Sequence, residues 1–423
     1  MLVADLLRRA VRKSSRLKNA IKKVTANVDT HIGEIFPFLT RKTTYKGTRL
    51  NILVPSINEE HVFGGIATAL KLFKELGINM GVDMRIITTD AAPSKKDLMR
   101  FEGYKLTFNS IDSEASNQIV PFNNRHKKTI TVGKNDIFIA TSWWTAYFIQ
   151  DIIDWQEKSY GIKHRMIYFI QDFEPGFYPW SSRYLLADST YRSDVSTLAV
   201  FNTRLLADYF KEMGYRFNEE YYFEPKLSKT LKEKLLSLDN VRKEKRIIIY
   251  GRPSVPRNAF SLIIEALRLW VVDNDDADEW EILSLGEKHP DIEISKGVKV
   301  VSYGKLTLEE YAETLASSYA GISLMVSPHP SYPPLEMASF NVTTITNNYS
   351  NKDMAYFSNF IRSLSNCNPR TVSDELREIT DSYEPNTMIK IDMSNSYYDD
   401  EPIFDFIDKI GKQVIESIEV RNK

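Results

Sequence analysis

The chain has 423 residues, of which 43% are hydrophobic and 12% aromatic, and its formal net charge is −1. This length predicts two or three domains, and the composition excludes a disordered chain because it supplies enough apolar surface for two cores. A net charge near zero argues against a nucleic-acid binder that relies on overall basicity. One cysteine excludes a disulfide framework and fits a reducing cytoplasm. The longest apolar runs, such as residues 137–140, are the size of a strand and too short to span a bilayer.

The first 48 residues differ in pattern from the rest. Their apolar side chains recur at steps of three, four or seven, and lysines and arginines occupy the positions between them. This pattern predicts a basic amphipathic helix over residues 1–28, in an extension that ends at residue 48. The segment lacks the uncharged apolar centre of a signal peptide, so we do not expect cleavage. The helix lies either on an anionic membrane surface or against its own domain or a second subunit of a homodimer.

Residues 49–225 alternate between apolar runs and helical patterns. Strands are predicted at 50–55, 84–88, 136–141, 166–171 and 197–201, and helices at 66–76, 144–155, 183–187 and 203–213. Such alternation, with nearly continuous apolar strands, predicts a parallel sheet covered by helices on both faces. Ligands bind beyond the carboxyl ends of the strands in these sheets.

Two of these strand ends carry candidate site residues. Gly64 and Gly65 stand where the first strand passes to the first helix, a position that lets a ligand approach the backbone. Gln171, Asp172 and Glu174 follow the strand at 166–171. Aromatic residues accompany them: Phe173, Phe177, Tyr178 and Trp180. Carboxylates bond sugar hydroxyls while rings pack on sugar C–H faces, which favours a sugar site; the alternative is that the rings are core and Asp172 caps a turn.

A lysine-rich polar segment at 226–245 predicts a linker, and a second domain follows at 246–402. Strands are predicted at 246–250, 280–285 and 298–303, helices at 261–270, 308–316 and 372–379, and a final helix within 403–423. The acidic run at 273–276 follows a helix, so we interpret it as a solvated loop and predict no metal site.

Residues 320–348 read as strand, loop, short helix and strand. Pro333 and Pro334 suit the first turn of a helix, because the missing N–H groups would have no partner there. The N–H of Leu335 then points into the loop, where an anion is the natural occupant. Glu336 could accept hydrogen bonds from sugar hydroxyls. The alternative is an ordinary corner of a doubly wound sheet.

Two basic residues share one context in the second domain. Arg252 follows a strand that ends at Gly251, and Lys305 follows a strand that ends at Tyr303 and Gly304. Both cations should lie at the same sheet edge as Glu336. Fixed cations at this position would stabilise the negative charge of a diphosphate leaving group as the glycosyl bond breaks.

These residues resemble the retaining glycosyltransferases of family four, which have the two-domain GT-B fold. The segment PPLEMASFNVTTITNN is similar to the second half of the family motif, in which seven residues separate two carboxylates; Glu336 matches the second carboxylate. Pro328 stands at the first, beside His329, so no role is transferred there. The resemblance implies diphosphate binding by Arg252 and Lys305 as the catalytic pair. It implies donor binding by Gly64, Gly65, Gly251, Arg252, Tyr303, Gly304, Lys305, Ser331, Tyr332, Leu335 and Glu336, and acceptor binding by Gln171, in place of a family histidine, Asp172 and Glu174.

The departures at Pro328, His329 and Gln171, with the basic N-terminal helix, look closest to rhamnosyltransferases that build bacterial surface rhamnans, including S-layer glycans. This resemblance implies a retaining, metal-independent enzyme without a cofactor that uses dTDP-β-L-rhamnose and a lipid-linked glycan acceptor. It would be cytoplasmic, on the inner face of the cell membrane. It also implies two Rossmann-like domains facing across a cleft, with the last helix crossing back to the first domain. Two alternatives remain: a UDP- or GDP-hexose transferase, and a non-catalytic two-lobed sugar-binding protein.

Overall fold

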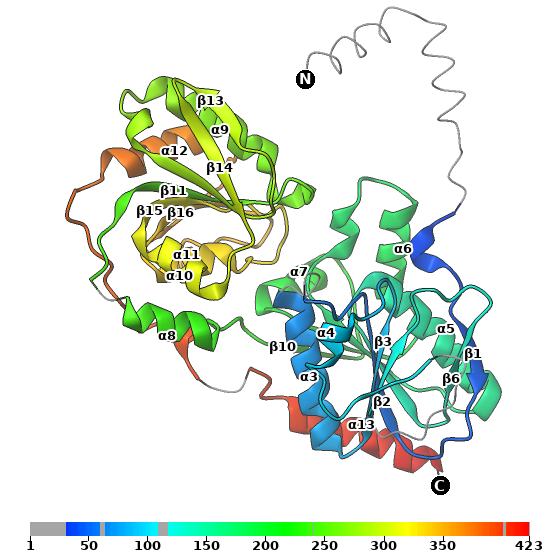
Figure 1. Ribbon diagram of the computed structural model, residues 1–423. Helices are drawn as coiled ribbons and strands as arrows, with labels where there is room; N and C mark the ends of the chain where they lie inside the picture. Colours follow the sequence, from blue (N-terminus) through cyan, green and yellow to red (C-terminus); the bar gives the residue numbers. More distant parts are fainter. Residues whose placement is uncertain (1–30, 60–63, 109–116, 239, 401–402, 423) are drawn as a thin grey trace, which may run out of the picture.

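The computed structural model describes residues 31–59, 64–108, 117–238, 240–400 and 403–422, and it contains two α/β domains (Figure 1). The helix predicted over residues 1–28 lies outside the described residues. Each domain has a central sheet covered by helices on both faces, as the alternation of strand and helix patterns predicts. Among the helices of these described ranges, none combines the length and the apolarity needed to cross a membrane.

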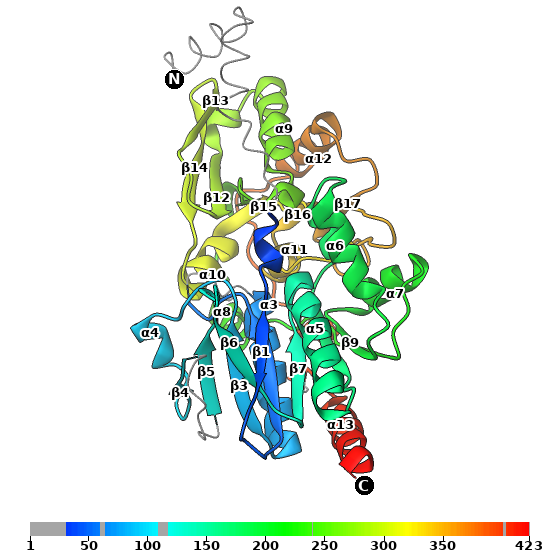
Figure 2. The same cartoon turned by 90° about the vertical axis from the view of Figure 1, so that its right-hand side faces the viewer.

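The first domain is built on an eight-stranded parallel sheet (Figure 2). Its strands are β2 (Arg49–Val54), β3 (Asp83–Thr88), β4 (Lys105–Leu106), β5 (Asn117–Pro121), β7 (Asp136–Ala140), β8 (Met166–Ile170), β9 (Thr197–Phe201) and β10 (Glu219–Tyr222). Their order across the sheet is β10-β9-β8-β7-β2-β3-β5-β4. The strands β2, β7, β8 and β9 are buried along their whole length, which explains their nearly continuous apolar sequence.

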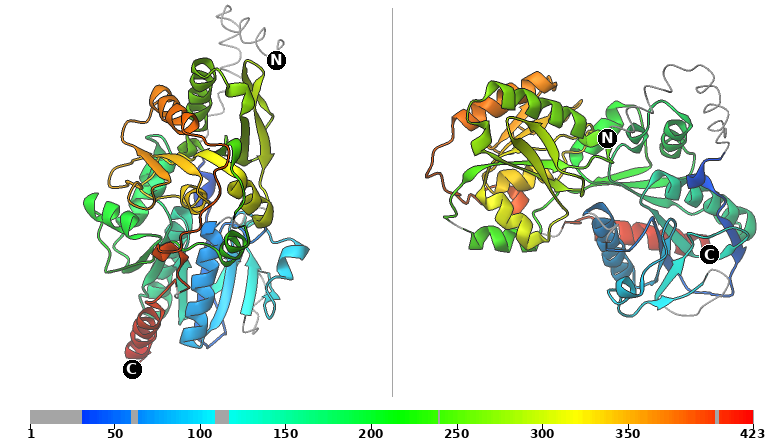
Figure 3. Two further views of the ribbon diagram at one scale, coloured as in Figure 1. Left: turned by 90° about the vertical axis from the view of Figure 1, so that its left-hand side faces the viewer. Right: turned by 45° about the horizontal axis from the view of Figure 1, so that its top comes forward.

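Helices cover both faces of this sheet. They are α3 (Gly64–Met80), α4 (Lys95–Leu98), α5 (Trp143–Tyr160), α6 (Ser182–Tyr191), α7 (Arg204–Glu212) and α13 (Ile407–Asn422), with the 3₁₀ turns η1 (Gly33–Ile35) and η2 (Glu174–Phe177). The last helix, α13, lies beside α3 (Figure 3). It buries Ile410 and Val414 in the core of the first domain, and Asn79 Nδ2 donates a hydrogen bond to Asp408 Oδ1 over 2.6 Å. The C-terminus thus crosses back to the domain that begins at residue 49.

In its described part, residues 31–48, the extension predicted to run to residue 48 contains the 3₁₀ turn η1 and a strand but no α-helix. Residues of β1 (Leu39–Lys42) pair in parallel with β6 (Thr129–Val132), in register Leu39 with Thr129. Phe38 is buried in the first-domain core against Phe122 and Phe148. The short stretch therefore completes the domain, and its backbone hydrogen bonds come from a distant segment that a local pattern cannot reveal.

The second domain has a seven-stranded sheet with the order β13-β14-β12-β11-β15-β16-β17. Its strands are β11 (Glu244–Gly251), β12 (Glu281–Gly286), β13 (Ile292–Ser295), β14 (Val298–Gly304), β15 (Ser318–Ile322), β16 (Thr343–Asn347) and β17 (Ile361–Leu364). All pairs are parallel except β13 with β14. The edge strand β13 forms an antiparallel hairpin that the sequence pattern did not predict.

The helices of the second domain divide between the two sheet faces. They are α8 (Lys229–Ser237), α9 (Phe260–Asp273), α10 (Leu308–Ser317), α11 (Pro333–Ser339) and α12 (Pro369–Asp381), with the 3₁₀ turns η3 (Pro256–Asn258), η4 (Ala277–Glu279) and η5 (Ser396–Tyr398). Helices α9 and α12 cover one face, and α8, α10 and α11 cover the other. The predicted linker at 226–245 is therefore only partly a connection, because α8 buries Leu231 and Leu235 in the second-domain core.

Candidate functional site

Four neighbouring strands of the second domain deliver the predicted donor residues to one sheet edge. The order β14-β12-β11-β15 places the carboxyl end of β11 between β12 and β15. Only β12 separates β14 from β11, so the ends carrying Lys305 and Arg252 lie roughly 10 Å apart across the sheet. The loop from β15 to α11 begins on the other side of β11. Two cations and one loop therefore share the edge at which ligands bind in doubly wound sheets.

The two glycines before these cations have a structural reason to be glycine. A Cβ on Gly251 would lie 2.0 Å from the hydroxyl oxygen of Ser284, so the strand end has no room for a side chain. Gly304 has a φ of 74°, a left-handed conformation that favours glycine. Lys305 is exposed, and its Nζ donates to the backbone oxygen of Glu59 over 3.4 Å. That contact joins the second domain to the loop after β2 in the first.

The loop between β15 and α11 carries a buried histidine, His329, directly after Pro328, which stands at the position of the first carboxylate in the resembling family. His329 is 6% exposed, and burial lowers its pKa to about 4, so the ring is neutral at pH 7. Its Nδ1 accepts a hydrogen bond from Ser331 N over 3.0 Å, which assigns the proton to Nε2. Within the part of the chain that the structure describes, buried Nε2 makes no hydrogen bond of good geometry, although the backbone of Asn202 lies near enough to raise the pKa of the ring slightly against the effect of burial. Such an atom commonly marks the place of a ligand or water.

The short helix α11 places the side chains of Glu336 and Leu335 in different surroundings. Burial raises the pKa of Glu336 to about 7, and Tyr311 donates a hydrogen bond to its Oε2 over 3.1 Å. Glu336 is half-buried and remains open to hydrogen bonding, as its predicted role requires. The side chain of Leu335 packs in the second-domain core, so any contact with a donor would use its backbone N–H.

The first domain contributes its glycine pair and the segment after β8. Gln171 Oε1 lies 1.7 Å from the point where a Cβ on Gly65 would stand, so Gln171 occupies the space that this glycine leaves. A Cβ on Gly64 would meet the ring of Tyr332 at 3.8 Å. The hydroxyl of Tyr332 also donates to Asn202 Oδ1 over 3.2 Å. The predicted residues of the two domains thus meet at one place.

Asp172 is the centre of the contact between the domains. It is buried, and its Oδ1 accepts hydrogen bonds from Phe173 N, at 2.8 Å, and from the hydroxyl of Ser327. Arg257 Nε lies 3.5 Å from Oδ2, a distance for an ion pair rather than a hydrogen bond. The same guanidinium stands 4.1 Å above the ring of Phe177. One carboxylate of the first domain therefore holds two residues of the second.

Glu174 differs sharply from Asp172, although only one residue separates them. Burial raises the pKa of Glu174 to about 8, against the lowering effect of the Trp143 N–H that donates to its Oε2. It is therefore mostly protonated at pH 7, and its exposed fraction is 9%. This geometry gives Glu174 a role in fixing the start of α5, and its predicted contact with an acceptor stays a prediction.

Three residues other than glycine adopt positive φ around this edge. They are Thr203 at 148°, Ala259 at 50° and Ser331 at 70°. Thr203 follows β9, Ala259 opens α9, and Ser331 lies in the loop before α11. Such backbone conformations cost about 1–3 kcal/mol each and cluster at ligand sites, where surrounding structure holds them.

Sequence reasoning missed Arg257, Ser327 and Lys352. Arg257 follows Arg252 by five residues in the same loop, and this second cation was the available signal. Lys352 is buried and donates to the backbone oxygen of Met325 over 2.6 Å, and burial lowers its pKa to about 8. Ser327 and Lys352 have no local motif, because their function as contacts depends on the tertiary fold.

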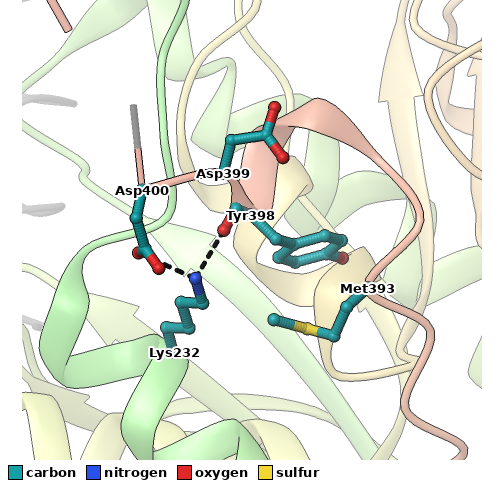
Figure 4. Close-up of a pocket in the computed structure, with 5 residues that line it drawn as sticks. All are labelled: Lys232, Met393, Tyr398, Asp399 and Asp400. Atoms are coloured by element: carbon teal, nitrogen blue, oxygen red, sulfur yellow. Dashed lines mark hydrogen bonds and ion pairs between the residues drawn. The ribbon is translucent and has the colours of Figure 1, made fainter. Parts of the chain in front are cut away.

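A hollow of about 700 Å³ lies elsewhere, between α8 and the segment that includes η5 (Figure 4). Lys232 Nζ donates there to the backbone oxygen of Tyr398 over 2.6 Å and to Asp400 Oδ1 over 2.8 Å. Asp399 and Met393 complete the lining shown in Figure 4. Because Asp400 pairs with Lys232 and Asp399 adds a second carboxylate, this hollow is poorly suited to a diphosphate.

The architecture and this edge define the molecule as a GT-B protein. The fold is similar to the crystal structure of WaaG, a glycosyltransferase involved in lipopolysaccharide biosynthesis, with a TM-score of 0.51 and 12% identity over 86% of this chain and 99% of that chain. It is also similar to the crystal structure of TarM, with a TM-score of 0.51 and 8% identity over 88% of this chain and 96% of that chain. The predicted GT-B fold is thereby confirmed.

The amino-acid sequence identifies the protein family more specifically than the fold does. Residues 49–204 belong to the family described as the WsaF N-terminal domain, and residues 245–377 to the WsaF C-terminal domain. The O-antigen biosynthesis protein RfbC of Myxococcus xanthus is 30% identical over 213 residues, a match that covers 50% of this chain. The chain spans 15% of the length of that relative.

Proposed function

We propose that the protein is a glycosyltransferase of surface-glycan synthesis that moves a sugar from a nucleoside-diphosphate donor to a glycan acceptor. The observation that carries the proposal is that Arg252 and Lys305 follow strands that end at the same sheet edge. This edge lies opposite the glycine loop of the first domain. A protein that binds neutral sugar has no use for two cations at this edge, whereas a diphosphate leaving group needs them. The name of the Myxococcus xanthus relative, an O-antigen biosynthesis protein, supports the surface-glycan context.

The chemistry proposed at this edge is retaining transfer without a metal. The bond between the anomeric carbon and the donor phosphate oxygen breaks, and the acceptor hydroxyl oxygen bonds to that carbon on the same face. The proton of this hydroxyl passes to the departing phosphate oxygen, so the atoms balance without a side-chain base. Arg252 and Lys305 stabilise the charge that develops on the diphosphate. Glu336 accepts a hydrogen bond from the pentose of the donor nucleotide, which in a dTDP donor is a deoxyribose with a free 3′-hydroxyl.

The donor that we propose is dTDP-β-L-rhamnose, with a lipid-linked rhamnan-type glycan as acceptor at the inner face of the membrane. The support for rhamnose is the sequence resemblance to rhamnosyltransferases of bacterial surface rhamnans. Asp172 and Gln171 are the first-domain side chains proposed to meet the acceptor, since both lie beyond the carboxyl end of β8. A UDP- or GDP-linked hexose is the alternative donor within the same fold.

A nucleotide panel tests this function in two steps. Thermal unfolding should shift upward with dTDP and remain unchanged with NAD, because a ligand that binds only the folded state stabilises it by mass action. Arg252→Ala and Lys305→Ala should lose this shift and should lower transfer from dTDP-rhamnose by roughly a hundredfold or more.

The matched control is Lys299→Ala, because Lys299 lies at the start of β14, the strand whose other end Lys305 follows, and is half exposed. This variant should retain both the shift and the rate. A larger shift with UDP or GDP would reassign the donor within the same proposal. The absence of a shift with any of the three diphosphates would favour the non-catalytic sugar-binding protein.

A further inference from the structure

A fully exposed tryptophan stands on the segment that leaves the candidate site. Trp180 lies between η2 and α6, and 98% of its side chain is accessible to solvent. Leu185, on the first turns of α6, is 67% exposed. Tryptophan is highly buried on average, so a ring of this size left uncovered indicates a surface that meets a partner.

A second aromatic ring lies beside Trp180. The rings of Trp180 and Tyr184 are nearly parallel, with an interplanar angle of 12° and centroids 6.2 Å apart. Ser181 caps α6 by accepting a hydrogen bond from Tyr184 N over 3.3 Å, and Arg183 pairs with Glu34 at 2.7 Å. The structure thus presents two nearly parallel aromatic rings side by side, and we call Trp180 and Tyr184 the aromatic ledge.

The ledge continues the candidate site. The segment that carries it starts at Asp172, which contacts the second domain, and passes through Phe177, whose ring lies beneath the Arg257 guanidinium. Trp180 follows Phe177 by three positions, so their Cα atoms are at most about 11 Å apart. An oligosaccharide with its reacting end near Asp172 could reach the ledge within a few sugar units.

The charge around the ledge favours a neutral, hydroxyl-rich ligand. Pro179, Ser181 and Ser182 are exposed and uncharged, and the nearest cation in sequence, Arg183, is paired with Glu34. A surface that docks on anionic lipid relies on several lysines or arginines near the membrane. Aromatic faces flanked by hydroxyls instead match the C–H faces and hydroxyls of sugars.

We propose that the ledge of Trp180 and Tyr184 is a distal subsite for a sugar unit of the acceptor glycan, several units from the hydroxyl that reacts. This inference rests on the proposed function, because it assumes a glycan acceptor. The subsite gives the enzyme a preference for acceptors long enough to reach it. The contact is made away from the reacting atoms, so it contributes to acceptor binding and leaves the chemical step unchanged.

The test uses rhamnose and α- or β-linked rhamnose di-, tri- and tetrasaccharides as probes, with the full-length chain. Titration calorimetry should show tighter binding as the acceptor lengthens, and Trp180→Ala should weaken binding of the tetrasaccharide about three- to tenfold. Binding of rhamnose itself should not change. In transfer assays the same variant should raise KM for the tetrasaccharide at unchanged kcat, and Trp180→Phe should retain most of the length preference.

Met99→Ala is the control, because Met99 is 79% exposed and lies at the end of α4 in the same domain. Equal tetrasaccharide affinity in Trp180→Ala and wild type would overturn the inference. A loss of binding to phosphatidylserine vesicles with unchanged sugar affinity would identify a lipid contact instead. A melting temperature several degrees lower in Trp180→Ala would mean that the chain itself covers the ring. The nucleotide shift separately tests the proposed function, since the ledge does not contact the nucleotide edge.

Discussion

Two clusters of buried charge lie at opposite edges of the first-domain sheet. The first comprises Arg49, Arg85 and Asp136 at the amino-terminal edge. The second, at the carboxyl edge, comprises buried Asp172, Glu174, His329 and Lys352, with the partly exposed Arg257 paired to Asp172. Both contain charged groups that are expensive to bury, but their hydrogen-bonding states differ.

The first cluster has dense internal hydrogen bonding. Arg49 binds Asp136 through both Nε, at 3.0 Å, and a terminal nitrogen, at 2.9 Å, and Gly133 N donates to the same carboxylate over 2.8 Å. Arg85 also donates to Asn51 Oδ1 over 2.6 Å. Burial raises the pKa of Asp136, but the two arginines outweigh it, so the pKa lies below its usual value. This arrangement is structural.

The second cluster is incompletely bonded. Among the described residues, the buried atoms His329 Nε2 and Arg257 Nε make no hydrogen bond of good geometry, and their nearest partners are the Asn202 backbone and, at 3.5 Å, Asp172 Oδ2. Burial moves the pKa of Glu174 up and those of His329 and Lys352 down, each toward the neutral form. Groups that are buried, shifted and partly unpaired are typical of ligand sites. The two clusters therefore differ in the direction of their pKa shifts: the first favours the charged carboxylate of Asp136, and the second favours neutral forms of Glu174, His329 and Lys352.

The largest effect should come from breaking the first cluster. Asp136→Asn leaves two buried guanidinium groups without their countercharge and should lower the free energy of unfolding by about 3–5 kcal/mol. Urea denaturation measures this loss. Asp154→Asn, which breaks a pair with Lys163 at half-exposed positions, should cost at most about 1 kcal/mol. Equal losses in the two variants would contradict the structural assignment.

A smaller effect should appear at Glu174. The unfolded chain loses the proton of this carboxyl near pH 4.5, while the folded chain keeps it until about pH 8. The unfolded state therefore binds fewer protons in this window, and the stability of the wild type should fall as pH rises through it. Glu174→Gln does not titrate, so its stability relative to wild type should increase across the same window.

Urea midpoints measured across this pH range provide the test, with Glu212→Gln as the control because Glu212 is exposed in the same domain. The urea midpoint of this control should change with pH as that of the wild type does. If the urea midpoints of Glu174→Gln and wild type changed equally with pH, the pKa of Glu174 would not be raised by folding. Glu174 would then be charged in the folded protein, and the contrast with Asp172 would be wrong.

The sequence predicted the parts of the site that depend on strand ends. Arg252 and Lys305 could be placed because each follows a glycine at the end of an apolar strand, and parallel strands of one sheet bring such ends together. Asp172 could be predicted as a site residue for the same reason, since a polar residue directly after a buried strand is poor core material. The resemblance of the segment around Glu336 to a family motif indicated the order in which Arg252, Lys305 and Glu336 follow one another along the chain.

Other features depend on tertiary contacts and had no local signal. Ser327 reaches Asp172 across the two domains, at a sequence separation of 155 residues. The strand β1 exists because β6 pairs with it, and its short sequence carries no pattern of its own. Sequence also placed Asp172 and Glu174 in one role, whereas the structure exposes their different surroundings. Side-chain direction after a strand end is set by packing, which spacing does not predict.

Hydrogen–deuterium exchange with dTDP most directly tests the claim that the incompletely bonded edge is the nucleotide-sugar site. Ligand binding should slow exchange in segments 251–257, 303–306 and 331–336, because it suppresses local opening where it binds. Exchange at β2 around Arg49 and in the lining of the hollow near Lys232 should change much less. Protection confined to that hollow, with none in the three edge segments, would contradict the account.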